Sequence, residues 1–277
     1  MSTPPAIDPP RAAVFILSTG RTGTMALAHN LDNAYDEVTA FHEPKPVRHF
    51  RLLSNRIASG RAVPTSVGVK LLKAARWRRM RVGQGAVYVE SNWYLYGLVD
   101  ALATAFGKVK VLHVVRDPRT IVPSFINYGS FSGIKGAATR FLPYWWLKPE
   151  QCVNNPLGRT WADLSPAERA SWHWTAVNGH IDRAIAAAGA TIEGRRVLYE
   201  DLFAPAHPAM TDLLHWIGLP VTAERTAQLQ RQRANASPKG GSSWQRMDPA
   251  ERDRVLQMCG PLMQTYGYDA ATEPRDA

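Results

Sequence analysis

The chain has 277 residues, 45% of them hydrophobic, and a formal net charge of +10. This length and composition suit one large globular domain and exclude a disordered or fibrous chain. Two cysteines, Cys152 and Cys259, are too few for a disulfide framework or a cysteine metal site. No apolar run reaches the roughly 20 residues that span a bilayer, so we expect a soluble, cytoplasmic protein.

Residues 1–11 contain four prolines and no apolar segment typical of a signal peptide, which predicts a flexible N-terminal tail. Residues 12–268 are predicted to form a single domain, and residues 269–277 a C-terminal tail.

Apolar runs alternate with amphipathic segments along this domain. The predicted strands are Ala13–Leu17, Val38–Phe41, Ala86–Glu90, Lys110–Val115 and Arg196–Tyr199. The predicted helices are Thr22–Leu31, Pro46–Ala58, Tyr94–Phe106, Pro118–Asn127, Pro166–Ala188, Pro208–Ile217, Ala223–Gln232 and Pro249–Thr265. Ser66–Trp77 fits a strand or a helix. The fold class we predict is α/β, a doubly wound, mainly parallel sheet flanked by helices, with a P-loop-like nucleotide-binding architecture.

The first predicted strand ends in the loop Ser18–Thr24, "STGRTGT", just before a helical pattern. Its two glycines allow positive φ, its threonines add hydroxyl donors, and Arg21 adds a permanent charge. Backbone N–H groups in such a loop and at the following helix N-terminus bind anions. The glycine spacing is too short for a nucleotide-kinase P-loop and no lysine follows Gly23, so the loop predicts an anion other than Mg·ATP.

A second strand-to-helix turn, "VVRDPR", repeats this pattern. Arg116 ends the strand and Ser124 lies on the next helix, where the two side chains could converge on a second phosphate. Asp117 offers the alternative of a Walker B magnesium ligand, although an arginine adjoins it and the first loop lacks its lysine.

Three further segments are distinctive. The helix that begins at Pro166 has a capping box from Ser165 and Glu168, and His173 on it is expected on the polar face, as is His180. Residues 128–160 mix glycine, proline and aromatic residues without a period, which is typical of a lid or substrate wall. The basic cluster Lys73–Arg81 is expected to be a solvated helix face.

These motifs together resemble the sulfotransferases that use 3′-phosphoadenosine-5′-phosphosulfate (PAPS). The resemblance rests on Arg21–Thr24, on "VVRDPR" with Ser124, and on "YED" at Tyr199–Asp201, and it runs from Val14 to Tyr268. The triplet His42-Glu43-Pro44 after the second strand is similar to the bacterial and carbohydrate sulfotransferase branch.

The resemblance implies a role for each matching position. The residues implied to hold the 5′-phosphosulfate are Gly20, Arg21, Thr22, Gly23, Thr24 and Met25. Arg116 and Ser124 would hold the 3′-phosphate, and Tyr199 would lie near the adenine. Lys239 and Gly240, in the glycine- and serine-rich loop 235–244, would close over the 3′-phosphate, although "SPKGG" departs from the commoner Arg-Lys-Gly form.

The implied reaction is metal-independent sulfuryl transfer from PAPS to an acceptor hydroxyl, leaving 3′-phosphoadenosine-5′-phosphate (PAP). Arg21 would stabilise charge on the leaving group, and Glu43 is the first candidate for the general base. His42 is a second candidate, although strand alternation points it away from Glu43, and Glu90 is a third.

Two other functions stay open: a divergent P-loop kinase, and a non-catalytic protein that binds a nucleotide or an anionic polymer. The acceptor is expected to be a small molecule, a lipid or a carbohydrate, and not a nucleic acid. Tyr144, Trp145 and Trp146 are predicted to line it. The sequence predicts no oligomeric state.

Overall fold

The structure is a computed structural model that describes residues 11–80, 87–231 and 243–275. The strands are β1 Ala12–Leu17, β2 Val38–His42, β3 Val87–Ser91, β4 Val109–Val115 and β5 Ile192–Leu198. The helices are α1 Thr24–Ala34, α2 Val47–Ala58, α3 Thr65–Met80, α4 Val99–Phe106, α5 Pro118–Asn127, α6 Gly133–Arg140, α7 Pro166–Ala188, α8 Tyr199–Phe203, α9 Ala209–Ile217, α10 Ala223–Arg231 and α11 Pro249–Thr265. Short 3₁₀ helices include η1 Trp93–Leu98, η2 Pro149–Gln151 and η3 Trp161–Asp163.

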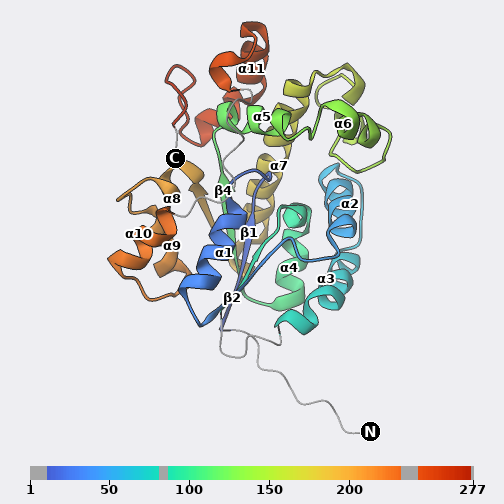
Figure 1. The fold of residues 1–277 in the computed structure, drawn as a ribbon. Coiled ribbons are helices and arrows are strands. Elements are labelled where there is room, and N and C mark those ends of the chain that lie inside the picture. Colours follow the sequence, from blue (N-terminus) through green and yellow to red (C-terminus); the bar gives the residue numbers. More distant parts are fainter. Residues whose placement is uncertain (1–10, 81–86, 232–242, 276–277) are drawn as a thin grey trace.

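The described residues form one five-stranded sheet of order β2-β3-β1-β4-β5, and all its paired strands are parallel. Helices cover both faces (Figure 1). One face packs on α2, α3, α4, α7 and α11 through residues such as Phe15, Val111 and Trp174. The other packs on α1, α8, α9 and α10 through residues such as Ile16, Leu112 and Leu213. This is the α/β fold class predicted from the alternating apolar runs.

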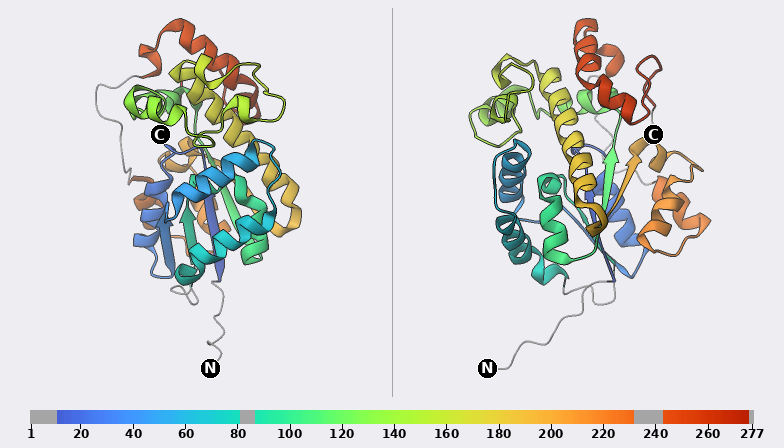
Figure 2. Two further views of the ribbon diagram at one scale, coloured as in Figure 1. Left: turned by 90° about the vertical axis from the view of Figure 1, so that its right-hand side faces the viewer. Right: turned by 180° about the vertical axis from the view of Figure 1, so that it is seen from behind.

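The long helix α7 crosses one face of the sheet and reaches the irregular segment above its carboxyl edge (Figure 2). It spans Pro166–Ala188 as predicted, and Ser165 and Glu168 form both bonds of the capping box. Trp174, Val177 and Ile181 on it are fully buried. The helix therefore fixes the segment that precedes it against the strand ends.

Several predicted boundaries were wrong. Strand β5 begins at Ile192 and not at Arg196, because it is an edge strand whose exposed charged residues hide the apolar pattern. Tyr199 begins α8 and does not end the strand. The predicted helix Tyr94–Phe106 is two elements, η1 and α4. Gly97 lies within η1, where a Cβ would come within 2.6 Å of the Ser54 backbone.

Other segments gain a definite structure. Ser66–Trp77, left open between strand and helix, lies within α3. Residues 128–160 contain α6 and η2 among irregular turns. Residues 269–275, expected as a tail, contact the domain: the Thr272 carbonyl accepts a hydrogen bond from Arg119, and Arg275 lies 2.8 Å from Asp201. Among the described residues, every helix is too short or too polar to cross a membrane.

Candidate active site

The candidate site lies at the carboxyl edge of the sheet, between β1 and β4, where the connections from adjacent strands lead to opposite sides of the sheet. The chain leaves β1 through α1 toward β2 on one side, whereas it leaves β4 through α5 toward β5 on the other. Ligands of open α/β sheets bind in the crevice between two such strands. The loop Ser18–Thr24 and the turn at Arg116 are the two sides of this crevice.

The backbone of the first loop has the conformation of an anion cradle. Gly20, Arg21 and Gly23 have φ values of 81°, 59° and 67°, and the Gly20 N–H donates to the Ser18 hydroxyl at 3.1 Å. Gly23 is the N-cap of α1 and has no side chain to cap it. The helix N-terminus therefore depends on another acceptor, the role that a bound anion fills.

Gly23 is also required by its neighbour. A Cβ at this position would lie 2.5 Å from the ring of Tyr199, which is the first residue of α8. The tyrosine ring therefore packs directly on the loop. Two positions 176 residues apart in the chain therefore form one surface.

Two arginines hold the two halves of the crevice together. Arg21 Nε donates to Ser124 Oγ at 3.2 Å, and Arg116 Nη1 donates to the Arg21 carbonyl at 3.1 Å. The Arg116 guanidinium also stacks over the Tyr199 ring at 4.5 Å. The structure thus brings Arg21, Arg116, Ser124 and Tyr199 into one cluster, although the sequence separates them widely.

This cluster carries positive charge without a carboxylate partner. Burial lowers the pKa of Arg21, and Arg116 lowers it further, whereas the Tyr128 ring stacks on its guanidinium at 4.8 Å. Within the described part of the chain, neither arginine has a carboxylate within ion-pair distance. The Thr22 hydroxyl is buried and has no hydrogen-bond partner. Unpaired cations beside an unpaired hydroxyl fit an anionic ligand.

Asp117, the candidate magnesium ligand, is engaged elsewhere. Its carboxylate pairs with Arg119 at 2.7 Å and caps the N-terminus of α5, and the residue is fully buried. Its own N–H donates to Glu200, whose second oxygen accepts from the Tyr268 hydroxyl. Both carboxylates therefore belong to a packed network beneath the loop, which argues against the Walker B alternative.

Glu43 follows β2 in a left-handed conformation with φ of 43°. Its N–H donates to the Ser91 carbonyl at 2.8 Å, which extends the pairing with β3 by one residue. Burial raises the pKa of the Glu43 carboxyl, whereas the charge of Arg51 and a hydrogen bond from the Trp93 side chain lower it. Trp93 also packs beside Gly20 in the first loop. The carboxyl group is thus partly buried and linked to the cradle through one indole ring.

His42 lies closer to Glu43 than strand alternation predicts. Its Nε2 is 3.7 Å from a Glu43 carboxylate oxygen, and its Nδ1 is 3.1 Å from the Ser91 hydroxyl. The expectation of opposite directions was wrong, because Glu43 lies beyond the strand end where its positive φ turns the side chain back. Burial lowers the pKa of His42, so it is neutral near pH 7.

Glu90, the third candidate base, is fully buried in a closed cluster. Arg76 contacts both of its oxygens, at 2.5 and 2.7 Å, and Tyr88 and Asn92 donate to them as well. Arg76 also donates to the carbonyls of Pro44 and Lys45, both at 3.0 Å. Glu90 has no oxygen free for a substrate, and with Arg76 it holds the turn that carries Glu43.

The basic cluster Lys73–Arg81 is therefore not a uniform solvated face. Arg76 is 0% exposed, whereas Lys73 is exposed and Arg81 lies outside the described residues. The local pattern of α3 misses this because the partner of Arg76 is on β3.

The prediction that His173 lies on a polar helix face was also wrong, since the residue is buried. Its Nε2 lies 2.9 Å from the Thr19 carbonyl in the first loop, which identifies Nε2 as the protonated nitrogen. Rings of Trp93, Phe125, Phe131 and Trp146 surround it, and burial lowers its pKa to about 4. A neutral imidazole thus supports the loop from below. His180 is partly buried too, and burial lowers its pKa to about 4.

The predicted acceptor wall has a different composition from the one expected. Trp146 is buried in the core, and Trp145 and Trp146 each turn a face toward the Arg51 guanidinium. The backbone of Tyr144 accepts a hydrogen bond from Asn55 at 2.7 Å. Exposed apolar side chains of this segment are instead Tyr128, Phe141, Leu142 and Val153.

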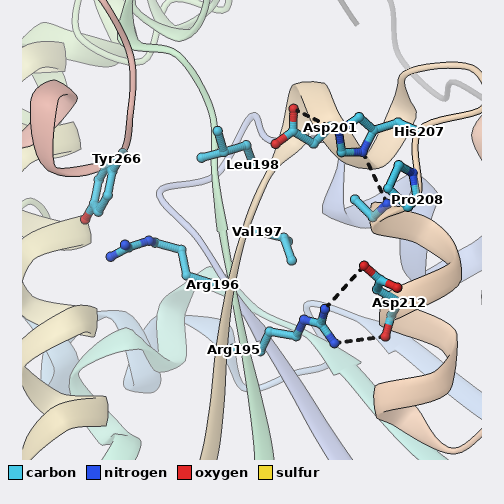
Figure 3. A pocket seen from close by; sticks show the side chains of 10 residues that line it. Arg195, Arg196, Val197, Leu198, Asp201, His207, Pro208, Asp212 and Tyr266 are labelled. Carbon is cyan, nitrogen blue, oxygen red and sulfur yellow. Dashed lines mark hydrogen bonds and ion pairs between the residues drawn. The ribbon is translucent and has the colours of Figure 1, made fainter.

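A pocket of about 260 Å³ lies on the outer side of β5 (Figure 3). Its charged side chains are paired: Arg195 with Asp212, Arg196 with Asp182, and Asp201 with Arg275. It thus lacks the uncompensated charge of the crevice between β1 and β4. Lys239 and Gly240, the predicted closing loop, lie outside the described residues.

Comparison with known proteins yields matches among solved structures. The chain is similar to a sulfotransferase domain from the curacin biosynthetic pathway, at 14% identity and a TM-score of 0.52, covering 95% of this chain and 99% of that one. It is also similar to a sulfotransferase domain of the Synechococcus PCC 7002 olefin synthase, at 16% identity and a TM-score of 0.51, covering 97% of this chain and 98% of that one. A sulfotransferase from Alicyclobacillus acidocaldarius matches at 18% identity and a TM-score of 0.51, covering 94% of this chain and 98% of that one.

No family model matches the sequence, and no curated protein matches it. At 14 to 18% identity, the likeness shows that this chain has the fold of those sulfotransferase structures over nearly its whole length.

Proposed function

We propose that this protein is a PAPS-dependent sulfotransferase that transfers a sulfuryl group to an acceptor hydroxyl. The observation that carries the proposal is the convergence of Arg21, Arg116, Ser124 and Tyr199 at the switch point of the sheet. Two arginines without carboxylate partners there fit a ligand with phosphates at two ends. The shared fold with sulfotransferase structures supports the same function.

The residues present fit the donor. In the proposal, the loop Gly20–Thr24 and the amide of Met25 hold the 5′-phosphosulfate, with the unpartnered Thr22 hydroxyl as one donor. Arg116 and Ser124 hold the 3′-phosphate, and the Tyr199 ring lies beside the adenine. Lys239 and Gly240 are proposed to close over this end.

The proposed chemistry is a single in-line displacement. The acceptor oxygen forms a bond to sulfur while the bond from sulfur to the 5′-phosphate oxygen breaks, and PAP leaves. The acceptor proton passes to the Glu43 carboxylate. Burial raises the pKa of Glu43, which makes it a stronger base than an exposed glutamate. Arg21 stabilises the charge that develops on the leaving oxygen.

The chemistry of the donor explains the missing kinase lysine. A transferred sulfuryl group carries less negative charge than a phosphoryl group, so hydrogen bonds and arginines are sufficient to stabilise it. The kinase alternative is less consistent with this chain, because Asp117 pairs with Arg119 beneath the loop. A non-catalytic binding protein would have no use for a carboxylate such as Glu43 beside the cradle.

The acceptor is proposed to be a hydroxyl compound, either a small molecule, a lipid or a carbohydrate. The segment 128–160 lies above the strand ends (Figure 1) and exposes Tyr128 and Phe141, with Tyr128 stacked on Arg21. An apolar or aromatic portion of the acceptor would pack there.

Donor binding is tested by thermal unfolding with PAP, PAPS and ATP, each with EDTA or with Mg²⁺. We expect PAP and PAPS to raise the melting temperature equally with EDTA and with Mg²⁺, and ATP to raise it less. No stabilisation by PAP would contradict the proposal, and a Mg²⁺-dependent response to ATP alone would favour a kinase.

Transfer is tested with PAPS labelled in the sulfuryl group against panels of carbohydrates, lipids and phenols. Glu43→Gln is expected to lose transfer by about 10²- to 10⁴-fold and to keep PAP binding. The matched control is Glu193→Gln, which alters an exposed glutamate on β5. Equal activity of Glu43→Gln and the wild type would remove Glu43 as the base.

A further inference from the structure

The side chain of Arg51 on α2 lies among aromatic rings, and the roles proposed above for the donor-binding residues and for Glu43 do not explain this environment. Its guanidinium carbon lies 4.6 to 5.0 Å from the ring centroids of Trp93, Tyr94, Trp145 and Trp146. These rings come from η1 and from the irregular segment before α7, and the arginine is only 9% exposed. We call this group of four rings the aromatic cage.

The cage leaves the guanidinium with few hydrogen bonds. Its one bond, from Nη2 to the Tyr94 hydroxyl, is long at 3.4 Å, and Nε has no partner. Within the described residues, no carboxylate lies within ion-pair distance of it. Arg76, by contrast, donates to Glu90 and to two carbonyls. A buried cation with so few hydrogen bonds is costly, which marks Arg51 as a candidate for a role beyond the fold.

Trp93 connects Arg51 to that neighbour. One face of its ring lies against the Arg51 guanidinium, and its side chain donates a hydrogen bond to Glu43. The charged groups that face Glu43 are His42, which is neutral near pH 7, and Arg51, and Tyr94 is the nearby phenol. Arg76 and Arg79 bond to carbonyls of the adjoining turn, and Arg76 is neutralised by Glu90. Arg51 is the cation whose charge lowers the pKa of Glu43.

We propose that Arg51 is a positioning residue whose charge keeps the Glu43 carboxyl ionised, and that the aromatic cage excludes the water that would screen this charge. The proposal rests on the proposed function, since it concerns the base of that reaction. Burial alone disfavours the carboxylate, and a protonated Glu43 cannot accept the acceptor proton. A nearby caged cation restores the ionised form without contacting any substrate.

The direct test is the pKa of Glu43, measured from the carboxyl ¹³C signal of labelled protein and assigned with Glu43→Gln. Arg51→Met is expected to raise this pKa by about one unit, the size of one charge interaction across a few ångströms of protein. Arg51→Lys keeps the charge and is expected to leave the pKa near the wild-type value. Equal shifts in both variants would show a packing role and overturn the proposal, as would no shift in Arg51→Met.

Arg225→Met is the matched control, since Arg225 stacks on a single ring, Tyr35, on the other face of the sheet. It should leave the Glu43 signal unchanged. If Arg51→Met does not fold, Arg51→Gln gives the same comparison with a neutral side chain that retains hydrogen bonding.

Once the Glu43 signal is assigned, the wild type alone provides a second test. A caged charge is shielded from salt, so the pKa of Glu43 should change little between about 0.05 and 0.5 M salt, in contrast to exposed pairs. A strong salt dependence would contradict the role of the cage.

The two proposals fail in different ways. Arg51 variants should bind PAP as the wild type does, because Arg51 contacts no donor residue. Loss of PAP stabilisation in the wild type would contradict the sulfotransferase proposal, yet the Glu43 titration would still report on Arg51. If a transfer assay is available, the acid limb of its pH profile should shift upward in Arg51→Met and not in Arg51→Lys.

Discussion

Two clusters of polar side chains lie near the carboxyl edge of the sheet, one around Arg76 and one around Arg21 and Arg116, and their arginines are compensated in opposite ways. In the first, Arg76 is paired with Glu90 and donates to two further carbonyls, with both side chains 0% exposed. In the second, Arg116 donates to the Arg21 carbonyl and Arg21 donates to Ser124, and no carboxylate of the described chain pairs with either arginine. The first cluster is complete within the protein, whereas we propose that a ligand completes the second.

The difference separates structural from functional arginines by a physical criterion. A buried guanidinium whose donors are satisfied contributes to the fold, and removing it leaves a buried carboxylate uncompensated. A guanidinium that repels its neighbour is tolerated at a cost, which an anion then offsets. Mutations in the first cluster should therefore change stability, and mutations in the second should change ligand affinity.

The largest effect is expected from Arg76→Met. Loss of the guanidinium leaves Glu90 buried without its partner, which costs about 3 to 5 kcal/mol of the free energy of unfolding. Urea denaturation measures this value. The double variant Arg76→Met with Glu90→Gln should recover part of the loss, because no unpaired charge remains. A loss below about 1 kcal/mol in the single variant would contradict the structural role.

Arg116→Ala should have the second largest effect, and on affinity. Loss of a charged hydrogen bond weakens PAP binding by roughly 1.5 to 3 kcal/mol, measurable by calorimetry. The free energy of unfolding without ligand should fall far less than in Arg76→Met, because removal of Arg116 leaves no buried carboxylate without its partner. Unchanged PAP affinity would remove Arg116 from the donor site.

Ser124→Ala should weaken PAP binding by about 1 kcal/mol, the value of one neutral hydrogen bond. Ser124 and Arg116 are proposed to hold the same phosphate, and both contact Arg21, so the effects of Ser124→Ala and Arg116→Ala should not be additive. A double-mutant cycle in PAP affinity measures the coupling, and strict additivity would argue that the two side chains act at separate places.

The smallest expected effect is the pH dependence of stability at Glu43. Its pKa is raised in the folded protein, so the folded state holds the proton more tightly than the unfolded state. Its contribution to the free energy of unfolding is fully present below the unfolded pKa of about 4.3 and is lost as pH rises through the folded pKa. As pH rises from about 4 to 7, Glu43→Gln should therefore gain stability relative to the wild type. A relative loss over this range would contradict the raised pKa.

Local patterns in the sequence were sufficient for much of the fold. Apolar runs identified all five strands, since the three inner strands β3, β1 and β4 are buried on both faces. Only β5, an edge strand with exposed charged residues, was misplaced by more than one residue at its start. Capping residues identified α7 to the residue. The loop Ser18–Thr24 and Arg116 could be proposed from strand ends, since the topology of a parallel sheet brings such ends together, whereas Tyr199, Lys239 and Gly240 were implied by the resemblance to sulfotransferases.

Partnerships across the chain could not be predicted in the same way. Arg76 was expected in water because its helix looks polar, yet its partner Glu90 lies on a strand 14 residues away. His173 was expected on a polar face because nothing local shows that the Thr19 carbonyl, 154 residues away, needs a donor. The cage around Arg51 likewise joins three separate segments. One signal was available in the sequence: Arg51 stands between the apolar residues Phe50 and Leu52.

The contacts of residues 269–275 have a practical consequence for the preparation of this protein. The Thr272 carbonyl bonds to Arg119, which in turn holds Asp117 at the start of α5, and Arg275 pairs with Asp201 on α8, two residues from Tyr199. An affinity tag fused after these residues would lie beside contacts that position the segments of both Arg116 and Tyr199, and could disturb them. Purification through an N-terminal tag, attached ahead of β1 at the opposite edge of the sheet (Figure 1), leaves those contacts intact.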